Sequence, residues 1–128
     1  MRFIHLFIPF IFLFSVGVNA ELSTQQKREM KTTIENMRAV LPRRIDAMTT
    51  LVDTKMVGST WVLETRINTG GRILADTGKS YMRDYIKQQY CRPPYEYLDA
   101  GLIIENRYYD ENGKYLFTAS ASKSICGR

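Results

Sequence analysis

Two acidic residues, Asp53 and Glu64, are the first candidates for catalytic chemistry. They lie in residues 50–68, whose alternating pattern predicts a β-hairpin with a two-residue turn. That turn places the two side chains directly opposite each other, with their Cβ atoms about 5 Å apart. A glycosidase uses a pair of carboxylates for catalysis. Lys55 and Arg66 are close enough on the same face to neutralise both acids. We therefore interpret the pair as a solvated, charged face and predict no catalytic residue and no enzymatic activity.

A second candidate is the string Asp76-Thr77-Gly78-Lys79-Ser80, which contains the Gly-Lys-Ser end of a phosphate-binding loop. The string follows a predicted strand and precedes a predicted helix, as that loop requires. The motif also needs a glycine five positions before Gly78, and Ile73 stands there. Without that glycine the backbone amides cannot curl around a phosphate. We expect Asp76 or Thr77 to cap a helix instead, and we predict no nucleotide and no other cofactor.

The first 20 residues have the form of an export signal. A positive start, Met1-Arg2-Phe3, precedes an apolar run over residues 4–14, and Val18-Asn19-Ala20 has the small-x-small form that signal peptidase cleaves. An uncleaved anchor is the alternative, but the run is shorter than the roughly 20 residues that span a bilayer. We expect cleavage after Ala20, a periplasmic protein consisting of a single domain over residues 21–128, and no stable membrane anchor.

Composition agrees with one small domain. The 128 residues are 45% hydrophobic and 24% charged with a net charge of +5, which excludes intrinsic disorder. Removal of residues 1–20 lowers the net charge to +4 and takes away five of the six Phe and the only histidine, His5. The mature chain would therefore lack histidine for acid–base catalysis or metal binding.

Two cysteines, Cys91 and Cys126, remain in the mature chain. In an exported protein such a pair indicates a disulfide, which the chain-entropy model values at roughly 4 kcal/mol here. The alternatives are a reactive thiol or a metal ligand, and neither has a histidine or a third cysteine to support it. We predict a Cys91–Cys126 disulfide and no metal site.

Aromatic residues could form a recognition surface for a sugar, a peptide or single-stranded nucleic acid. Trp61 and most of the eight tyrosines fall on the expected core faces. Tyr95, Tyr97 and Tyr109 are less easily buried by pattern, and we take them as candidate partner-binding residues. The basic residues are dispersed and the net charge is modest, so we expect no nucleic-acid binding.

The expected elements are two helices and two hairpins. Ser23 and Gln26 form a capping box before a helix that ends at Pro42, and a second helix runs from Asp76 or Thr77 to Cys91. The second hairpin spans residues 102–125, with a four-residue loop that pairs Tyr109 with Lys114. The inward residues are expected to be Val52, Thr54, Met56, Trp61, Leu63, Thr65 and Ile67 of the first hairpin, Leu74, Tyr81, Met82, Tyr85, Ile86 and Tyr90 near the second helix, and Leu102, Ile104, Tyr108, Tyr115, Phe117, Ala119 and Ala121 of the second hairpin.

These elements predict an α+β fold in the order α-β-β-α-β-β. Two hairpins, each with one apolar face, are best satisfied by a single four-stranded antiparallel sheet with both helices on one face. The disulfide would tie the end of the second helix to the last strand.

Several short motifs resemble one family. Tyr90-Cys91-x-x-Pro94, Leu98-Asp99-x-Gly101-Leu102, Tyr108-Tyr109-Asp110-x-x-Gly113, a closing Cys126 and, further upstream, Leu41-Pro42 and Ile45-Asp46-x-x-Thr49-x-Leu51 are similar to the small periplasmic α+β pilotins of bacterial type II secretion systems. The resemblance covers most of residues 21–128. Members of that family bind a C-terminal helix of the secretin and are held at the outer membrane by an acyl chain. This sequence lacks the lipidated cysteine that would follow the signal peptide.

The resemblance implies a pilotin-like fold, the Cys91–Cys126 disulfide and helix binding in a groove. Our first hypothesis is a soluble periplasmic accessory protein that binds a peptide or helix of an envelope protein, such as one of a secretion system. A small secreted inhibitor or immunity protein, which blocks an enzyme with the loop over residues 95–99, is the second.

Overall fold

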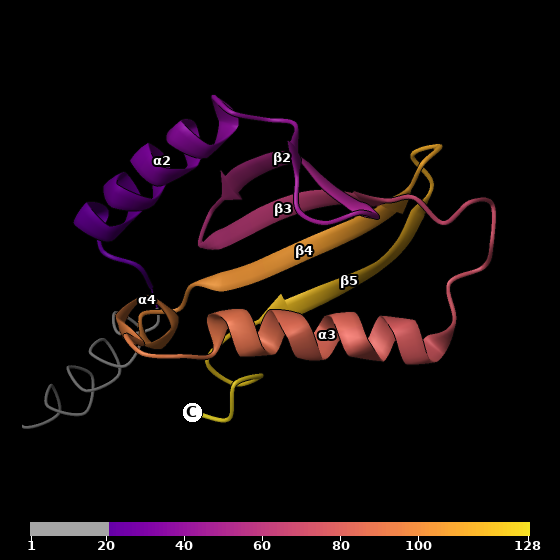
Figure 1. Ribbon diagram of the computed structural model, residues 1–128. Helices are drawn as coiled ribbons and strands as arrows, with labels where there is room; N and C mark the ends of the chain where they lie inside the picture. Colours follow the sequence, from indigo (N-terminus) through magenta and orange to yellow (C-terminus); the bar gives the residue numbers. More distant parts are fainter. Residues whose placement is uncertain (1–20) are drawn as a thin grey trace, which may run out of the picture.

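The computed structural model describes residues 21–128, so the predicted signal peptide and His5 lie outside the described residues. Helices and strands follow in the order α2 (Thr24–Arg38), β1 (Arg43–Arg44), β2 (Thr49–Val57), β3 (Thr60–Ile67), α3 (Asp76–Tyr90), α4 (Glu96–Asp99), β4 (Ile103–Asp110) and β5 (Tyr115–Ala121). The five strands form one sheet in sequence order (Figure 1). None of the helices in this part of the chain is long and apolar enough to span a membrane.

The predicted four-stranded antiparallel sheet is corrected in two respects. The short strand β1 adds a fifth strand beside β2, and β3 pairs with β4 in parallel, whereas the other pairs are antiparallel. The chain leaves β3 at Ile67, returns along α3 and α4, and re-enters the sheet at Ile103. A helical crossover of this kind brings the chain back to its starting end, so the two strands it joins run in the same direction.

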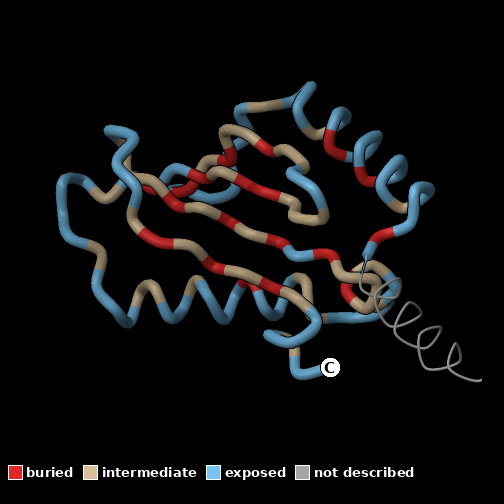
Figure 2. The backbone as a smooth tube through the Cα atoms, turned by 180° about the vertical axis from the view of Figure 1, so that it is seen from behind, coloured by how far each residue is buried: buried red, intermediate tan, exposed pale blue. Residues whose placement is uncertain are grey.

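One apolar cluster lies between the sheet and the two long helices. Helix α2 packs on β2 and α3 packs on β5, and both bury side chains in the same cluster as the inward residues of the strands. Figure 2 shows the buried positions concentrated on the strands and the outer sides of α2 and α3 exposed. The buried hydrophobic members are Leu22, Met30, Ile34, Leu51, Leu63, Ile67, Ile86, Leu98, Leu102, Ile104, Tyr108, Phe117, Ala119 and Ala121.

The first hairpin confirms the predicted register and contains one irregularity. Val57 pairs with Thr60 across a turn in which Gly58 has a φ of 61°, a conformation that glycine adopts without steric cost. A β-bulge lies between Leu51 and Asp53. The extra residue reverses the alternation, so Leu51 is buried in the core where Val52 was expected.

A second bulge corrects the loop of the last hairpin. Tyr108 pairs with Phe117, but Tyr109 pairs with Tyr115 rather than with Lys114. Tyr115 is therefore exposed and lies against the Tyr109 ring, with centroids 5.8 Å apart, instead of entering the core. The remaining inward residues predicted for this hairpin are buried.

Both helix starts were predicted to within one residue or two. The Ser23 hydroxyl accepts from the Gln26 N–H at 3.0 Å, and the Ser23 N–H donates to Gln26 Oε1 at 2.9 Å, which completes the predicted capping box. Helix α3 has Ala75 at its N-cap, without a side-chain cap, so neither Asp76 nor Thr77 caps it as expected.

Candidate functional site

A groove opens on the helix-covered side of the sheet. It is a cavity of about 220 Å³ between the turn over residues 45–49 and α3, with β3 and β4 as its floor. The turn, the two strands and the helix come from separate parts of the sequence and meet at this cavity. The lining residues are Ile45, Asp46, Thr49, Thr65, Tyr81, Met82, Tyr85, Asn106 and Tyr108.

The turn that forms one rim is held by its own polar groups. Asp46 Oδ1 accepts from the N–H groups of Met48 (2.8 Å) and Thr49 (2.9 Å), while Arg44 donates to the carbonyl oxygens of Asp46 and Ala47. The hydrogen bond from Met48 is the main cause that holds the pKa of Asp46 below its usual value. Asp46 is therefore ionised at neutral pH and places one fixed negative charge at the rim.

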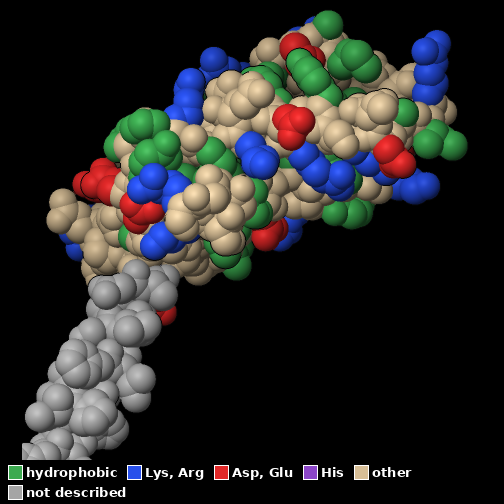
Figure 3. Space-filling model, turned by 90° about the horizontal axis from the view of Figure 1, so that it is seen from below, with side chains coloured by type: hydrophobic (Ala, Val, Ile, Leu, Met, Phe, Trp, Pro, Cys, Tyr) green, Lys and Arg blue, Asp and Glu red, His purple; other side chains and the backbone are tan. Residues whose placement is uncertain are grey.

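The opposite rim is the side of α3 that carries Tyr81, Met82 and Tyr85. The predicted core stripe of this helix included all three, but only Ile86 of α3 is buried, and Tyr81 and Tyr85 are 72% and 43% exposed. The apolar side of α3 is therefore wider than the part of the helix that β5 covers. Ile45 across the groove is 50% exposed. Figure 3, seen from the α3 side, shows hydrophobic side chains at the surface among charged ones.

The floor of the groove is buried and partly polar. Thr49, Thr65, Asn106 and Tyr108 are all buried, and the Thr65 hydroxyl donates to Asn106 Oδ1 at 2.9 Å. Burial, with smaller contributions from the nearby Tyr90, Tyr85 and Asp46, raises the pKa of Tyr108 to about 12. The phenol therefore stays protonated and can donate a hydrogen bond at any physiological pH.

This arrangement is suited to recognition. Exposed apolar side chains that converge on a cavity provide contact area, and a few buried polar groups provide orientation. In residues 21–128 no three His, Cys, Asp or Glu side chains are grouped so that they could hold a metal ion.

The three tyrosines proposed from the sequence lie elsewhere and apart. The Tyr95 ring lies under the Arg128 guanidinium, 3.5 Å from the ring centroid, and the Tyr97 hydroxyl donates to Glu29 on α2. The hydrogen bond to Glu29 raises the pKa of Tyr97 to about 12. Tyr109 lies near the other end of the sheet against Tyr115. Binding through these residues stays a prediction, and Tyr95 and Tyr97 already have partners within the chain.

The opposed carboxylates are present and paired with cations. Asp53 faces Glu64 in the predicted register. Lys55 lies 3.6 Å from Glu64, as expected, but the cation beside Asp53 is Arg38 of α2, at 3.5 Å, rather than Arg66. Sequence periodicity could not show this, because α2 meets β2 only in the folded chain.

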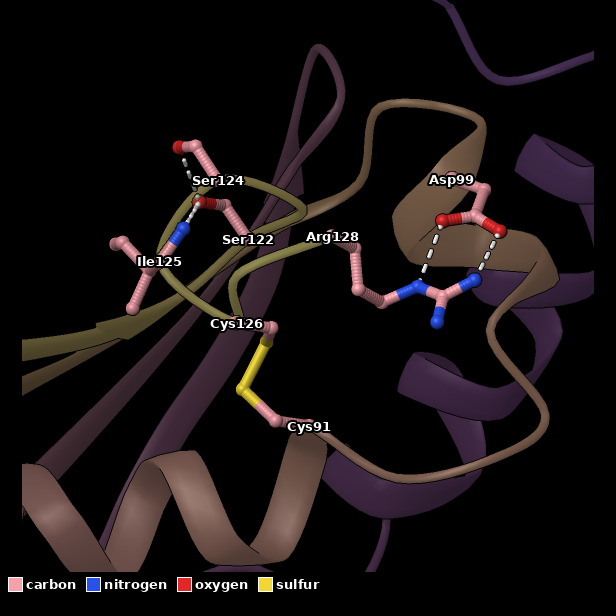
Figure 4. Close-up of a disulfide and its surroundings, with 7 residues drawn as sticks. All are labelled: Cys91, Asp99, Ser122, Ser124, Ile125, Cys126 and Arg128. Carbon is pink, nitrogen blue, oxygen red and sulfur yellow. Dashed lines mark hydrogen bonds and ion pairs between the residues drawn. A yellow bond between two sulfur atoms is a disulfide. The ribbon is translucent and has the colours of Figure 1, made fainter.

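The disulfide lies at the C-terminal end of α3. Cys91, at the end of α3, is bonded to Cys126, and their Cα atoms are 5.4 Å apart (Figure 4). Beside it, Arg128 forms a bidentate ion pair with Asp99 of α4. Its Nε donates to Asp99 Oδ1 at 3.0 Å and its Nη2 donates to Asp99 Oδ2 at 2.9 Å. The C-terminal residues are thus tied to both helices of the crossover.

The groove was not predicted as a site. One signal in the sequence lay near it, because Ile45, Asp46 and Thr49 belong to a segment that resembles the pilotins, and all three line the cavity. The groove residues of α3 could not be predicted, because the sequence does not show which apolar side chains of this helix the sheet leaves uncovered.

Comparison with solved structures supports a pilotin-like fold. A candidate secreted protein of Pseudomonas aeruginosa is similar with a TM-score of 0.67 and 11% identity, over 77% of this chain and 90% of that chain. The pilotin EpsS of the Vibrio vulnificus type 2 secretion system gives 0.61 and 14%, over 83% and 99%. The type II secretion system pilotin AspS of Vibrio cholerae gives 0.54 and 17%, over 77% and 94%. No family model and no curated protein sequence matches this chain.

Proposed function

We propose that this protein is an exported accessory protein that binds an amphipathic helix or peptide of an envelope protein in the groove beside α3. The observation that carries the proposal is the exposure of Ile45, Tyr81 and Tyr85 around one cavity with a buried floor. An amphipathic helix places its apolar face in a groove of this kind. The structural similarity to two pilotins supports a partner in the cell envelope.

The proposal includes export through residues 1–20, cleavage after Ala20 and residence in the periplasm. The Cys91–Cys126 disulfide supports an oxidising compartment. Glu21 stands where a lipoprotein would carry its acylated cysteine. We therefore propose binding of the partner without an acyl anchor, and no catalytic activity.

The inhibitor hypothesis receives less support. A loop that plugs an enzyme needs free side chains on a rigid segment. Residues 96–99 form α4 and Tyr95 is its N-cap, but Tyr95, Tyr97 and Asp99 all contact other parts of the chain. At the groove, by contrast, Ile45 and Tyr81 are 50% and 72% exposed.

Photocrosslinking inside cells that make the protein tests the proposal. The photoreactive residue p-benzoylphenylalanine replaces Tyr81 in one variant and Tyr115 in a matched control, because Tyr115 is also an exposed tyrosine but lies on the other face of the sheet. We expect position 81 to form an adduct with one segment of an envelope protein, identified by mass spectrometry, and position 115 to form none. No adduct at position 81, or the same adducts at both positions, would contradict the proposal.

A further inference from the structure

The groove floor contains a buried amide whose donor side is unused within the fold. Asn106 is 6% exposed and lines the cavity. Its Oδ1 accepts from the Thr65 hydroxyl, but among residues 21–128 no oxygen accepts a hydrogen bond from its Nδ2. Tyr108, 5% exposed on the same strand and in the same cavity, likewise donates to no oxygen of the described chain.

Buried donors without acceptors are rare in folded proteins, since removing them from water without a replacement hydrogen bond is unfavourable. In the free protein, water in the groove can serve these two groups. A bound segment that is apolar throughout would expel that water and leave the donors unpaired. The floor therefore discriminates against a purely apolar occupant.

The two donors define which group of a bound segment could serve as their hydrogen-bond acceptor. Both need an acceptor oxygen, because the Asn106 Nδ2 can only donate and the Tyr108 hydroxyl carries its proton, and an amide oxygen has two lone pairs with which to accept from them. The ionised Asp46 lines the same cavity with Arg44 beside it, so the rim has no excess of positive charge that would offset the burial of a second carboxylate. A main-chain carbonyl within a helix is already hydrogen-bonded. A neutral side-chain amide of the occupant, Gln or Asn, meets every condition.

We infer that Asn106 is a specificity-determining residue, which selects amphipathic segments with one Gln or Asn in the middle of their apolar face. The inference rests on the proposed function and names what that groove recognises. Apolar side chains of the occupant contact Ile45, Tyr81 and Tyr85, and its single amide reaches the Nδ2 of Asn106.

Three synthetic helical peptides test the inference on the oxidised full-length mature protein. They share one sequence with Leu at the contact positions and carry Gln, Leu or Glu at the central one. We expect the Gln peptide to bind about tenfold more tightly than the Leu peptide, as one satisfied buried hydrogen bond suggests, and the Glu peptide to bind most weakly. Fluorescence anisotropy measures all three dissociation constants.

Variants of the protein test whether Asn106 causes the preference for the Gln peptide. Asn106→Leu should abolish or reverse the preference for Gln, whereas Asn36→Leu, at an exposed asparagine of α2, should leave it unchanged. If circular dichroism shows that Asn106→Leu is unfolded, Asn106→Val replaces it. Tyr81→Ser should weaken all three peptides, because it removes part of the rim that they share.

The outcomes separate the two proposals. Peptides that bind in the groove with equal affinities, or with Leu preferred, would overturn the role of Asn106 and leave the proposed function standing. Failure of all three peptides to bind would count against the groove itself and therefore against the proposed function.

Discussion

The carboxylate of Glu111 joins two loops at the far end of the sheet. Its two oxygens accept hydrogen bonds from the Thr69 hydroxyl at 2.7 Å and from the N–H groups of Gly70 (2.8 Å) and Gly71 (3.3 Å). Hydrogen bonds from its own backbone N–H and from Thr69, with smaller effects of Gly71 and Gly70, lower the pKa of Glu111 to about 2. One ionised side chain therefore holds the start of the crossover against the β4–β5 turn.

Replacement of this carboxylate should have a pH-dependent effect on stability. The ordinary pKa of the group is 4.5 and the folded value is about 2, so its stabilisation is complete above about 4.5 and is lost as the pH falls toward 2. We expect Glu111→Gln to lower the urea midpoint at pH 7 and the difference from the unmodified protein to shrink over that interval. Glu35→Gln, at an exposed α2 position, is the control. A difference that persists unchanged at pH 2 would contradict this role of the ionised group.

Single residues were predictable where alternation was regular. Thr54, Leu63, Thr65 and Ile67 are buried as expected. Val52 and Tyr115 were misplaced because a bulge inserts one residue and exchanges the two faces, and no sequence signal marked either bulge. Tyr81 and Tyr85 have helical spacing with Ile86, but spacing alone cannot tell how wide a strip of the helix the sheet covers.

Helix α2 depends on the polar groups at its beginning. Its first turn contains no acidic residue, and only Met30 and Ile34 are buried, so packing stabilises it over a limited area. The capping box at Ser23 satisfies donors that the helix leaves without partners. The start of this element is therefore set locally, which is why the sequence predicted it.

Loss of that cap should destabilise the fold by a measurable amount. We expect Ser23→Ala to reduce the free energy of unfolding by about 1 kcal/mol, because the Gln26 N–H loses its acceptor. Thr24→Ala, at the next position and without a capping hydrogen bond, serves as the matched control. Urea denaturation of both variants measures the difference, and equal effects would argue against the cap as the cause.

The order of the long helices and strands could be predicted from periodicity, but the parallel pairing of β3 with β4 could not. The helical segment between the hairpins was predicted, but each hairpin was treated as a closed unit, and two such units could join in either direction. The direction is decided by α3 and α4 running back along the sheet from β3 to β4, which makes the pair parallel. β1 was missed because two arginines carry no strand signal and pair with β2 only once the 45–49 turn has formed.

The disulfide links the crossover to the C-terminal segment. Cys91 and Cys126 are 35 residues apart in the sequence, and the loop that they close includes α4 and both strands of the last hairpin. The Asp99–Arg128 ion pair and the Arg128–Tyr95 contact lie at the same junction. The loop that the disulfide closes is therefore long, and closing it restricts the unfolded chain substantially.

Removal of the disulfide should cost stability across the molecule. On the chain-entropy model we expect the double substitution Cys91→Ser and Cys126→Ser to lower the free energy of unfolding by about 4 kcal/mol. Guanidinium denaturation measures the change, and the protein purified without reductant should weigh two hydrogens less than its sequence mass. Two free thiols, or an unchanged midpoint after the substitution, would contradict the prediction.

Backbone amide chemical shifts can show whether the groove beside α3 is the surface that binds the peptide. We would titrate the ¹⁵N-labelled oxidised protein with the amphipathic peptide that carries the central Gln. We expect the largest chemical-shift changes in residues 45–49, 81–85 and 106–108, which line or adjoin the cavity. The largest shifts on the uncovered face, around Lys55, Glu64 and Arg107, would contradict it.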